Sequence, residues 1–270
     1  MSPGAGPLGT VVLTGATSGI GEAAARRLAS RATRLVLLGP EPPDDVAAVL
    51  AGVRRGGPAE VHYVAADFTR LREVVAAARR VRAVAPRIDL LVHDAAVPGS
   101  PERVLTEDGS ERTLQVDALA PALLTRLLVP ALHPGSRVVA VASSAHRVEP
   151  LDLDDPDLVR GYAPVTAYAR AKGAMLAWAL ALADELRPSG VDVVAVCPGL
   201  NATALSAALA GPVGGSPDRG ARRVLHAATA DVPSGSYLED DRVVPPAGDV
   251  TSAATRERLA ALLWARLRPF

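Results

Sequence analysis

Thr14-Gly15-Ala16-Thr17-Ser18-Gly19-Ile20-Gly21 is the stretch that decides the fold of this 270-residue chain. It follows the apolar run 11–13 and precedes a helical pattern that begins near Glu22. Its three glycines let the backbone turn sharply and approach a ligand closely, while the free N–H groups of the following helix point at that ligand. The stretch therefore predicts a strand, a glycine-rich turn and a helix whose N-terminus binds an anion, most often a phosphate. Its spacing differs from G-x-G-x-x-G, so a purely structural turn is the alternative.

A tyrosine and a lysine much further along the chain favour the ligand site. Tyr168 and Lys172 stand four residues apart in a helical pattern over 167–187, and this spacing puts both side chains on one face. A nearby ammonium favours the phenolate, so we expect the pKa of Tyr168 to fall below its usual value of about 10. A tyrosine tuned in this way can donate or accept a proton. The alternative is an exposed pair on a solvated face.

Taken in order, the motifs resemble those of the short-chain dehydrogenase/reductase family. They are T-G-x-x-x-G-I-G from Thr14, Ser143-Ser144 at one strand end, Y-x-x-x-K from Tyr168, and Pro198-Gly199 at another strand end. The resemblance covers essentially the full length, and segments 105–116 and 234–264 look most like the retinol dehydrogenase and protochlorophyllide reductase-like branch. It implies a Rossmann-type fold, a nicotinamide cofactor, and hydride transfer between that cofactor and a carbonyl or alcohol carbon.

The pattern of apolar runs predicts the same fold class independently. Short runs rich in β-branched residues indicate buried parallel strands at 11–13, 35–38, 61–65, 90–92, 138–142 and 191–196. Helical patterns alternate with them at 22–31, 45–55, 71–84, 110–132 and 167–187. This alternation predicts one α/β domain over 9–270, a doubly wound parallel sheet with helices on both faces. We expect a seventh strand near 236–238, and loops at 40–43, 56–58, 98–101 and 211–220.

The composition of the chain limits which partners and which cellular location we expect. The 29 basic and 29 acidic residues cancel, so no basic field attracts nucleic acid or an anionic membrane, and 49% apolar residues supply a core. Without a signal peptide or an evident membrane span, we expect a cytoplasmic protein with a disordered tail at 1–8. Cys197 is the single cysteine, which suits a buried thiol in a reducing compartment. The histidines lack ligand spacing, so we expect no metal site.

The cofactor is expected at the carboxyl ends of the strands. Gly15, Asp94, Ser144 and Pro198 each follow a predicted strand, and ligands of such sheets bind at that edge. The resemblance implies this set of cofactor-binding residues: Gly15, Thr17, Ser18, Gly19, Ile20, Gly21, Gly39, Asp67, Phe68, Asp94, Ala95, Ala96, Tyr168, Lys172, Pro198, Gly199 and Thr203.

Two members of this set have simpler alternatives. Asp67 resembles the family's aspartate that holds the adenine amino group, but it could equally be an N-cap before Leu71. Thr203 resembles part of the segment that closes over the cofactor, but it could instead cap the helix that follows.

The choice between nicotinamides depends on the end of the second strand. An acidic residue there bonds the ribose hydroxyls of NAD and repels the extra phosphate of NADP. Gly39 stands where NAD-preferring relatives carry Asp, and Pro40 stands where NADP-preferring relatives carry Arg. Because the Asp is missing and Glu41 is displaced, the sequence favours NADP(H).

For the reductive direction, the resemblance assigns four catalytic residues. Tyr168 gives its proton to the carbonyl oxygen, Lys172 lowers the pKa of Tyr168 and holds the nicotinamide ribose, and Ser144 bonds the substrate oxygen. We choose Ser144 over Ser143 because the family's catalytic serine is the second of such a pair. The fourth is Asp117, which replaces the family's asparagine, the residue thought to position a water that relays protons to the lysine.

Asp117 and the unusual pair His93-Asp94, where the family has Asn-Asn, leave three interpretations open. The first is an active reductase with an altered relay. The second is a non-redox enzyme, such as an isomerase, dehydratase or cyclase, that uses Asp117, Asp94 or His93 as an extra acid or base. The third is a nucleotide-binding regulatory protein, although the retained Ser144, Tyr168 and Lys172 argue against it.

The substrate and the oligomeric state are predicted only in outline. The loops expected around the pocket, 97–105, 145–165 and 200–215, are mostly apolar, which favours a hydrophobic ketone, aldehyde or secondary alcohol. Abundant alanine and arginine indicate a GC-rich bacterial source, which makes secondary metabolism a plausible setting. In many relatives the helices corresponding to 110–132 and 167–187 form a dimer face, so we expect a homodimer.

Overall fold

The sheet has the strand order β3-β2-β1-β4-β5-β6-β7-β8 in this computed structural model, which describes residues 8–211 and 213–270. The strands are β1 (Thr10–Thr14), β2 (Arg34–Gly39), β3 (Glu60–Ala65), β4 (Ile88–His93), β5 (Leu132–Val141), β6 (Asp192–Cys197), β7 (Tyr237–Glu239) and β8 (Arg242–Val243). Neighbouring strands from β3 to β7 are parallel, which confirms the predicted doubly wound sheet. The predicted tail at 1–8 lies outside the described residues except for Leu8, whose N–H donates to the carbonyl of Arg31 at 2.7 Å.

The eighth strand is the one the sequence did not predict. β8 is two exposed residues paired antiparallel with β7, and the turn between them carries positive φ at Asp240 and Asp241, +49° and +61°. Aspartate tolerates this conformation better than most residues, and two such residues make a tight hairpin. A strand this short has no periodicity for sequence reading to detect.

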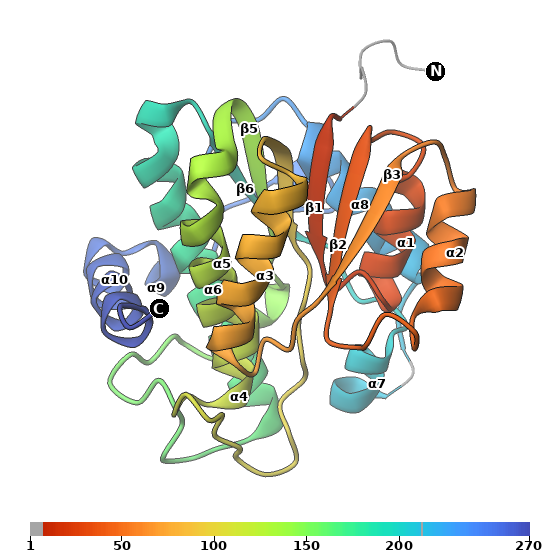
Figure 1. Cartoon of the computed structure of the whole chain (residues 1–270). Coiled ribbons are helices and arrows are strands. Elements are labelled where there is room, and N and C mark those ends of the chain that lie inside the picture. Colours follow the sequence, from red (N-terminus) through yellow and green to blue (C-terminus); the bar gives the residue numbers. More distant parts are fainter. Residues whose placement is uncertain (1–7, 212) are drawn as a thin grey trace.

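Helices cover both faces of the sheet (Figure 1). They are α1 (Gly19–Leu28), α2 (Ala47–Arg55), α3 (Leu71–Val84), α4 (Arg112–Leu114), α5 (Ala120–Leu128), α6 (Pro164–Leu186), α7 (Ala204–Ala210), α8 (Pro217–Thr229), α9 (Gly248–Thr251) and α10 (Ala253–Leu267). Successive residues of β1 pack into the helix layers on opposite faces of the sheet. Val11 and Leu13 pack with α1, α2 and α8, whereas Val12 packs with α3, α5 and α6. The carboxyl ends of the strands point to the edge where α4 and α7 lie (Figure 1).

Two predicted segments differ in detail from the structure. The predicted loop 211–220 ends earlier, because α8 begins at Pro217, whose fixed φ suits the first turn of a helix. The single helix predicted at 110–132 is broken into α4, a π-helical turn at Gln115–Leu119, α5, and a short 3₁₀ turn at Val129–Ala131. π-Turns insert one extra residue and often occur at functional sites, and this one contains Asp117.

The broken helix also belongs to the core. By length and composition, Arg112–Ala131 could cross a membrane, but 78% of its most apolar window is buried within the fold. It packs between α3 and α6. A buried core helix therefore accounts for its apolar composition.

The chain's own C-terminal helices pack beside α6 (Figure 1). Val250 of α9 and Leu259 of α10 join the core cluster that contains Met175 and Trp178 of α6, and Arg126 of α5 donates to the carbonyl of Leu267 at 2.8 Å. Part of the surface on which the sequence predicts a homodimer is therefore covered within one chain, and the dimer stays a prediction.

Candidate active site

A cleft of about 1010 Å³ opens at the carboxyl ends of the strands. It lies where the strand order changes, between β1 and β4, the expected ligand position in such a sheet. Of the predicted cofactor residues, only Gly21 is not on its wall. Lining the cleft are Gly15, Thr17, Ser18, Gly19, Ile20, Gly39, Asp67, Phe68, Asp94, Ala95, Ala96, Tyr168, Lys172, Pro198, Gly199 and Thr203.

The glycine-rich turn is shaped by close backbone contacts. Gly15 has φ +70°, and a Cβ there would lie 2.7 Å from the backbone of Ala95. Gly21 lies behind the turn, where a Cβ would meet the carbonyl oxygen of Gly15 at 2.1 Å. At the N-cap of α1, the Ser18 side chain makes no capping hydrogen bond, so the first N–H groups of the helix are left for a ligand. These features fit the diphosphate of a dinucleotide.

Thr203 performs the capping role given as its alternative, and it also lines the cleft. Its side chain accepts a hydrogen bond from the N–H of Ser206 at 3.2 Å and begins α7. A Cβ at Gly19 would lie 3.2 Å from the Thr203 methyl group, so the start of α7 faces the glycine-rich turn.

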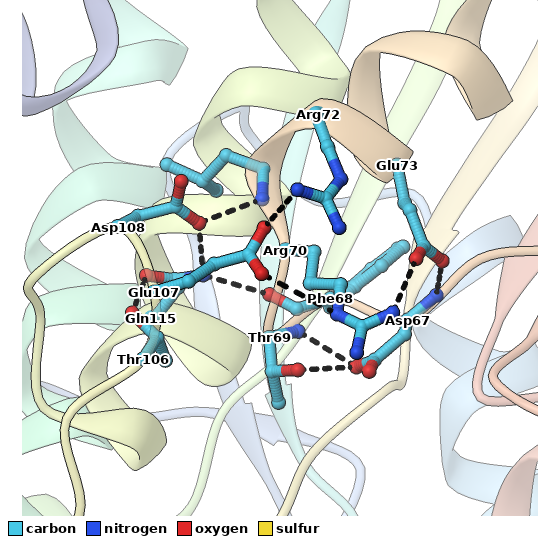
Figure 2. A network of polar contacts seen from close by, with 11 residues as sticks. Asp67, Phe68, Thr69, Arg70, Arg72, Glu73, Thr106, Glu107, Asp108 and Gln115 are labelled. Atoms are coloured by element: carbon cyan, nitrogen blue, oxygen red, sulfur yellow. Dashed lines mark hydrogen bonds and ion pairs between the residues drawn. The ribbon is translucent and has the colours of Figure 1, made fainter.

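Asp67 is not the N-cap of α3 (Figure 2). The N–H of Leu71 donates instead to the carboxylate of Asp108 at 2.8 Å. Asp67 turns back on its own loop, where Oδ1 accepts from the N–H and the hydroxyl of Thr69 at 2.9 and 2.7 Å. The capping alternative is therefore wrong, and Asp67 is left on the cleft wall as an acceptor.

Glu41 occupies the space expected for a specificity residue. A Cβ built on Gly39 would lie 3.0 Å from Glu41 Oε2 and 2.5 Å from the Thr17 methyl group. Within the described residues, Oε2 is buried and has no hydrogen-bond partner. The backbone beside it is fixed, because the hydroxyl of Tyr63 donates to the Glu41 carbonyl at 2.8 Å. A carboxylate therefore stands at the end of β2 although residue 39 has no side chain.

Tyr168 and Lys172 lie together, as their spacing predicts. Lys172 is 3% exposed, and its Nζ lies 5.5 Å from the centre of the Tyr168 ring. Nζ also donates to the carbonyl of Val141 at 3.3 Å and lies 3.2 Å from Asp117 Oδ2. The solvated alternative for the pair is wrong.

The predicted direction of the Tyr168 pKa is also wrong. Burial raises the pKa of Tyr168, and this effect outweighs the Lys172 ammonium, which lowers it. Asp117 adds to the rise because its negative charge opposes a phenolate. Burial works to lower the pKa of Lys172, but the carboxylates of Asp117 and Asp94 help raise it above its usual value.

The serine beside the tyrosine is Ser143 rather than Ser144. The Ser143 hydroxyl lies within hydrogen-bonding reach of the Tyr168 phenol and works to lower its pKa. It also accepts from the N–H of Ala145 at 3.2 Å. Ser144 is exposed at the cleft wall, and its own N–H points back to the sulfur of Cys197 at 3.3 Å. The choice of the second serine of the pair therefore misplaced the hydroxyl by one position.

Asp117 is fully buried and is not on the cleft wall. Its Oδ1 accepts from the N–H of Val97 at 2.8 Å, and its Oδ2 faces Lys172. Burial raises the pKa of Asp117, while the Lys172 ammonium works to lower it. Asp117 is thus placed to act on Lys172 and not directly on a substrate.

His93 does not face the cleft either. It is 1% exposed, its Nε2 lies 2.7 Å from the hydroxyl of Thr125, and its ring meets Trp178 edge to face. Burial lowers the pKa of His93 to about 3, so it is neutral. The suggestion that His93 is an extra acid or base is wrong.

Asp94 is at the cleft wall, beneath the glycine-rich turn. The N–H of Gly21 and the Lys172 ammonium stabilise its carboxylate, but burial dominates and raises the pKa of Asp94 to about 7. The backbone N–H groups of Asp94 and Ala95 both donate to the hydroxyl of Thr14 at 3.1 Å. Asp94 therefore joins the ends of β1 and β4.

Comparison with known proteins identifies the family. A sequence model described as short chain dehydrogenase matches residues 9–211. Mouse polyprenol dehydrogenase is 34% identical over 94% of this chain and 81% of its own. A Streptomyces sp. (strain C5) protein, provisionally named daunorubicin C-13 ketoreductase DnrU, is 35% identical over 94% of this chain and 90% of its own.

A solved structure shares this fold. The crystal structure of a short chain dehydrogenase from Burkholderia cenocepacia J2315 in complex with NADP superposes with a TM-score of 0.68, at 26% identity, over 87% of this chain and 97% of that one. With this match, the family model and the two relatives, the chain belongs to the short-chain dehydrogenase/reductase family of NAD(P)-dependent oxidoreductases.

Proposed function

We propose that the protein transfers hydride between a nicotinamide and the carbonyl or alcohol carbon of a hydrophobic small molecule. The observation that carries this proposal is the grouping of Tyr168, Ser143 and Lys172 at one end of a cleft whose other end is the glycine-rich turn. Bound there, the cofactor would supply or accept the hydride.

The residues present fit a dinucleotide along the cleft. The turn at 15–20 and the start of α1 would hold the diphosphate, and Asp67 with Phe68 would border the adenine. Asp94 to Ala96, Pro198, Gly199 and Thr203 line the wall towards Tyr168, so the nicotinamide end would lie there.

Tyr168 is suited to give a proton. Because burial raises its pKa, it holds its proton at neutral pH, as a general acid for carbonyl reduction requires. We assign the substrate-oxygen hydrogen bond to Ser143. Lys172, buried and paired with Asp117, would hold the nicotinamide ribose and keep a positive charge beside the phenol.

For the choice of nicotinamide, the sequence favours NADP(H) because Gly39 lacks a carboxylate. The position of Glu41 supports the opposite choice. Its carboxylate lies beside Gly39 at the end of β2, where it would bond ribose hydroxyls and repel a 2′-phosphate. We therefore propose NAD(H), and Glu41→Gln is expected to shift the NADH to NADPH ratio of kcat/KM towards NADPH.

Two observations support a hydrophobic substrate. The cleft wall near Tyr168 carries valine and leucine side chains, and two relatives are named as a polyprenol dehydrogenase and a ketoreductase. A role in bacterial secondary metabolism, a cytoplasmic location and a homodimer are kept as parts of the proposal. Analytical ultracentrifugation of the purified protein would test the homodimer. Neither Asp117 nor His93 reaches the cleft, so two of the three groups named for the non-redox alternative are set aside. Asp94 does line the cleft, where it joins the ends of β1 and β4 beneath the glycine-rich turn.

The test is turnover of NADH and NADPH with a panel of hydrophobic ketones and aldehydes, followed by nicotinamide absorbance and product mass. Oxidation of cofactor with a product reduced by two hydrogens is expected, and Tyr168→Phe should lower kcat by about 10²–10⁴-fold while cofactor binding persists. A product of unchanged redox state, or unimpaired turnover in Tyr168→Phe, would rule the proposal out.

A further inference from the structure

Apart from the hydroxyls of Ser143, Ser144 and Tyr168, the described part of the cleft has a largely apolar wall and one cation that is not paired with a carboxylate. Its wall carries the side chains of Val97, Val116, Val148, Val165, Leu200, Leu205 and Leu209. Among the described residues that line the cleft, Arg112 and Lys172 are the only cationic side chains. Lys172 is already paired with Asp117 at 3.2 Å. Arg112 is therefore the cationic side chain of the cleft wall that has no carboxylate partner among the described residues.

Arg112 is fixed in place by polar contacts that leave its charge unmatched. It is the first residue of α4, its N–H donates to the carbonyl of Val104 at 3.0 Å, and its Nη1 donates to the hydroxyl of Ser100 at 2.6 Å. Within residues 8–211 and 213–270, no carboxylate lies within 4.0 Å of the guanidinium, and neither Nε nor Nη2 has a protein acceptor. A guanidinium has five N–H donors in a rigid fork, so most of its binding capacity is unused.

The neighbouring Glu111 does not neutralise this charge by contact. Its Oε2 accepts from the N–H of Leu114 at 2.8 Å, and its Oε1 accepts from the hydroxyl of Thr113 at 3.1 Å. The carboxylate is therefore used to cap α4 and is 1% exposed.

Arg112 belongs to the catalytic end of the cleft. Ser100, its partner, also accepts at its carbonyl from the hydroxyl of Tyr162 at 2.8 Å. The preceding Gly99 packs so closely on Pro164, the first residue of α6, that a Cβ would meet the Pro164 carbonyl oxygen at 2.1 Å. The segment that holds Arg112 thus lies against the start of the helix that carries Tyr168.

We propose that Arg112 is a substrate-recognition residue, and that the substrate is an apolar carbonyl or alcohol compound bearing a carboxylate. The free edge of the guanidinium would bind the carboxylate through two parallel hydrogen bonds while the apolar wall holds the carbon skeleton between it and the reacting carbon. This inference rests on the proposed function and narrows its substrate class.

The test uses benzoylalkanoates of increasing chain length, each paired with its neutral methyl ester. For the chain length that spans the distance from Tyr168 to Arg112, the wild-type kcat/KM of the acid should exceed that of the ester by about 10–100-fold. Arg112→Leu should abolish this preference by raising KM for the acid about 10–100-fold, with a much smaller change for the ester. Arg112→Lys should retain part of it, because the charge remains and the fork is lost. Arg54→Leu, on the exposed surface of α2, is the matched control and should change nothing.

Binding is measured as well, so that the result does not depend on turnover. Calorimetric titration of Tyr168→Phe protein loaded with oxidised cofactor should show tighter binding of the acid than of the ester, and the added Arg112→Leu change should remove the difference. Equal binding of acid and ester, no detectable binding of either, or an equal loss for both in Arg112→Leu overturns the inference. The proposed function fails separately, if no neutral ketone is reduced with either nicotinamide.

Discussion

The two ends of the cleft are built by different kinds of force. At the glycine-rich turn, the shape is set by backbone packing, with Gly15 against Ala95 and Gly21 against Gly15. At the catalytic end, the pKa of Tyr168 is set first by burial and then by the charges on Lys172 and Asp117. Packing contacts act over a few tenths of an ångström, whereas charges act across several ångströms and depend on burial. The first end should therefore fail abruptly when a methyl group is added, and the second should respond gradually when a charge is removed.

Gly15→Ala tests the backbone end and has the largest expected effect. Positive φ costs a non-glycine residue about 1–2 kcal/mol, and overlap with the Ala95 backbone at 2.7 Å adds about 1–3 kcal/mol. We expect a loss of about 2–5 kcal/mol in the free energy of unfolding, measured by urea denaturation, or else a displaced turn that no longer binds cofactor.

Gly161→Ala is the matched control for this change. Gly161 has a similar φ of +65°, but no atom lies within 4 Å of an added Cβ, so only the conformational cost of about 1–2 kcal/mol should appear. Equal losses in the two variants would show that close packing does not define the turn.

The difference between the two ends explains what the sequence could predict. The sequence correctly predicts the turn, the strands β1 to β6 and the helices α1, α2, α3 and α6, because these elements carry local signals of glycine spacing and apolar periodicity. The π-turn at 115–119 could not be predicted, since it depends on how α4 and the turn itself pack on α6 while α5 packs on α3. The cap of α3 was missed for a related reason, because Asp108 reaches Leu71 from a loop distant in sequence.

Ser143→Ala and Ser144→Ala test the chemical end by comparison of two adjacent hydroxyls. Removal of the hydroxyl that bonds a developing oxyanion costs about 10²–10³-fold in kcat, and Ser143 is the serine whose hydroxyl acts on the pKa of Tyr168. We expect that loss in Ser143→Ala and nearly wild-type kcat in Ser144→Ala, both measured in steady-state assays with cofactor affinity as the folding control. A larger loss of kcat in Ser144→Ala than in Ser143→Ala would instead support Ser144, the serine predicted from the sequence.

The errors at this end share a physical origin. A pair of adjacent serines in sequence does not show which hydroxyl faces the tyrosine, because the register after β5 decides that. Likewise, the Tyr168 and Lys172 spacing correctly predicts their proximity, but the sign of the pKa shift depends on burial and on Asp117. Arg112 carries no motif, and its place in the cleft follows only from the contacts of α4 with the loop at Ser100.

Asp117→Asn has the smallest expected effect and the most specific one. It removes a negative charge that raises the pKa of Tyr168, so that the Lys172 ammonium, which favours the phenolate, is opposed mainly by burial. The pKa of Tyr168 should therefore fall. In carbonyl reduction, which needs the protonated phenol, the decline of kcat at high pH should therefore move to lower pH. In alcohol oxidation, which needs the phenolate, the rise of kcat with increasing pH should move to lower pH as well. Asp67→Asn makes the same chemical change at the other end of the cleft and should leave both profiles in place. A profile that stays fixed in Asp117→Asn, or that moves to higher pH, would show that the buried carboxylate does not act on the tyrosine through its charge.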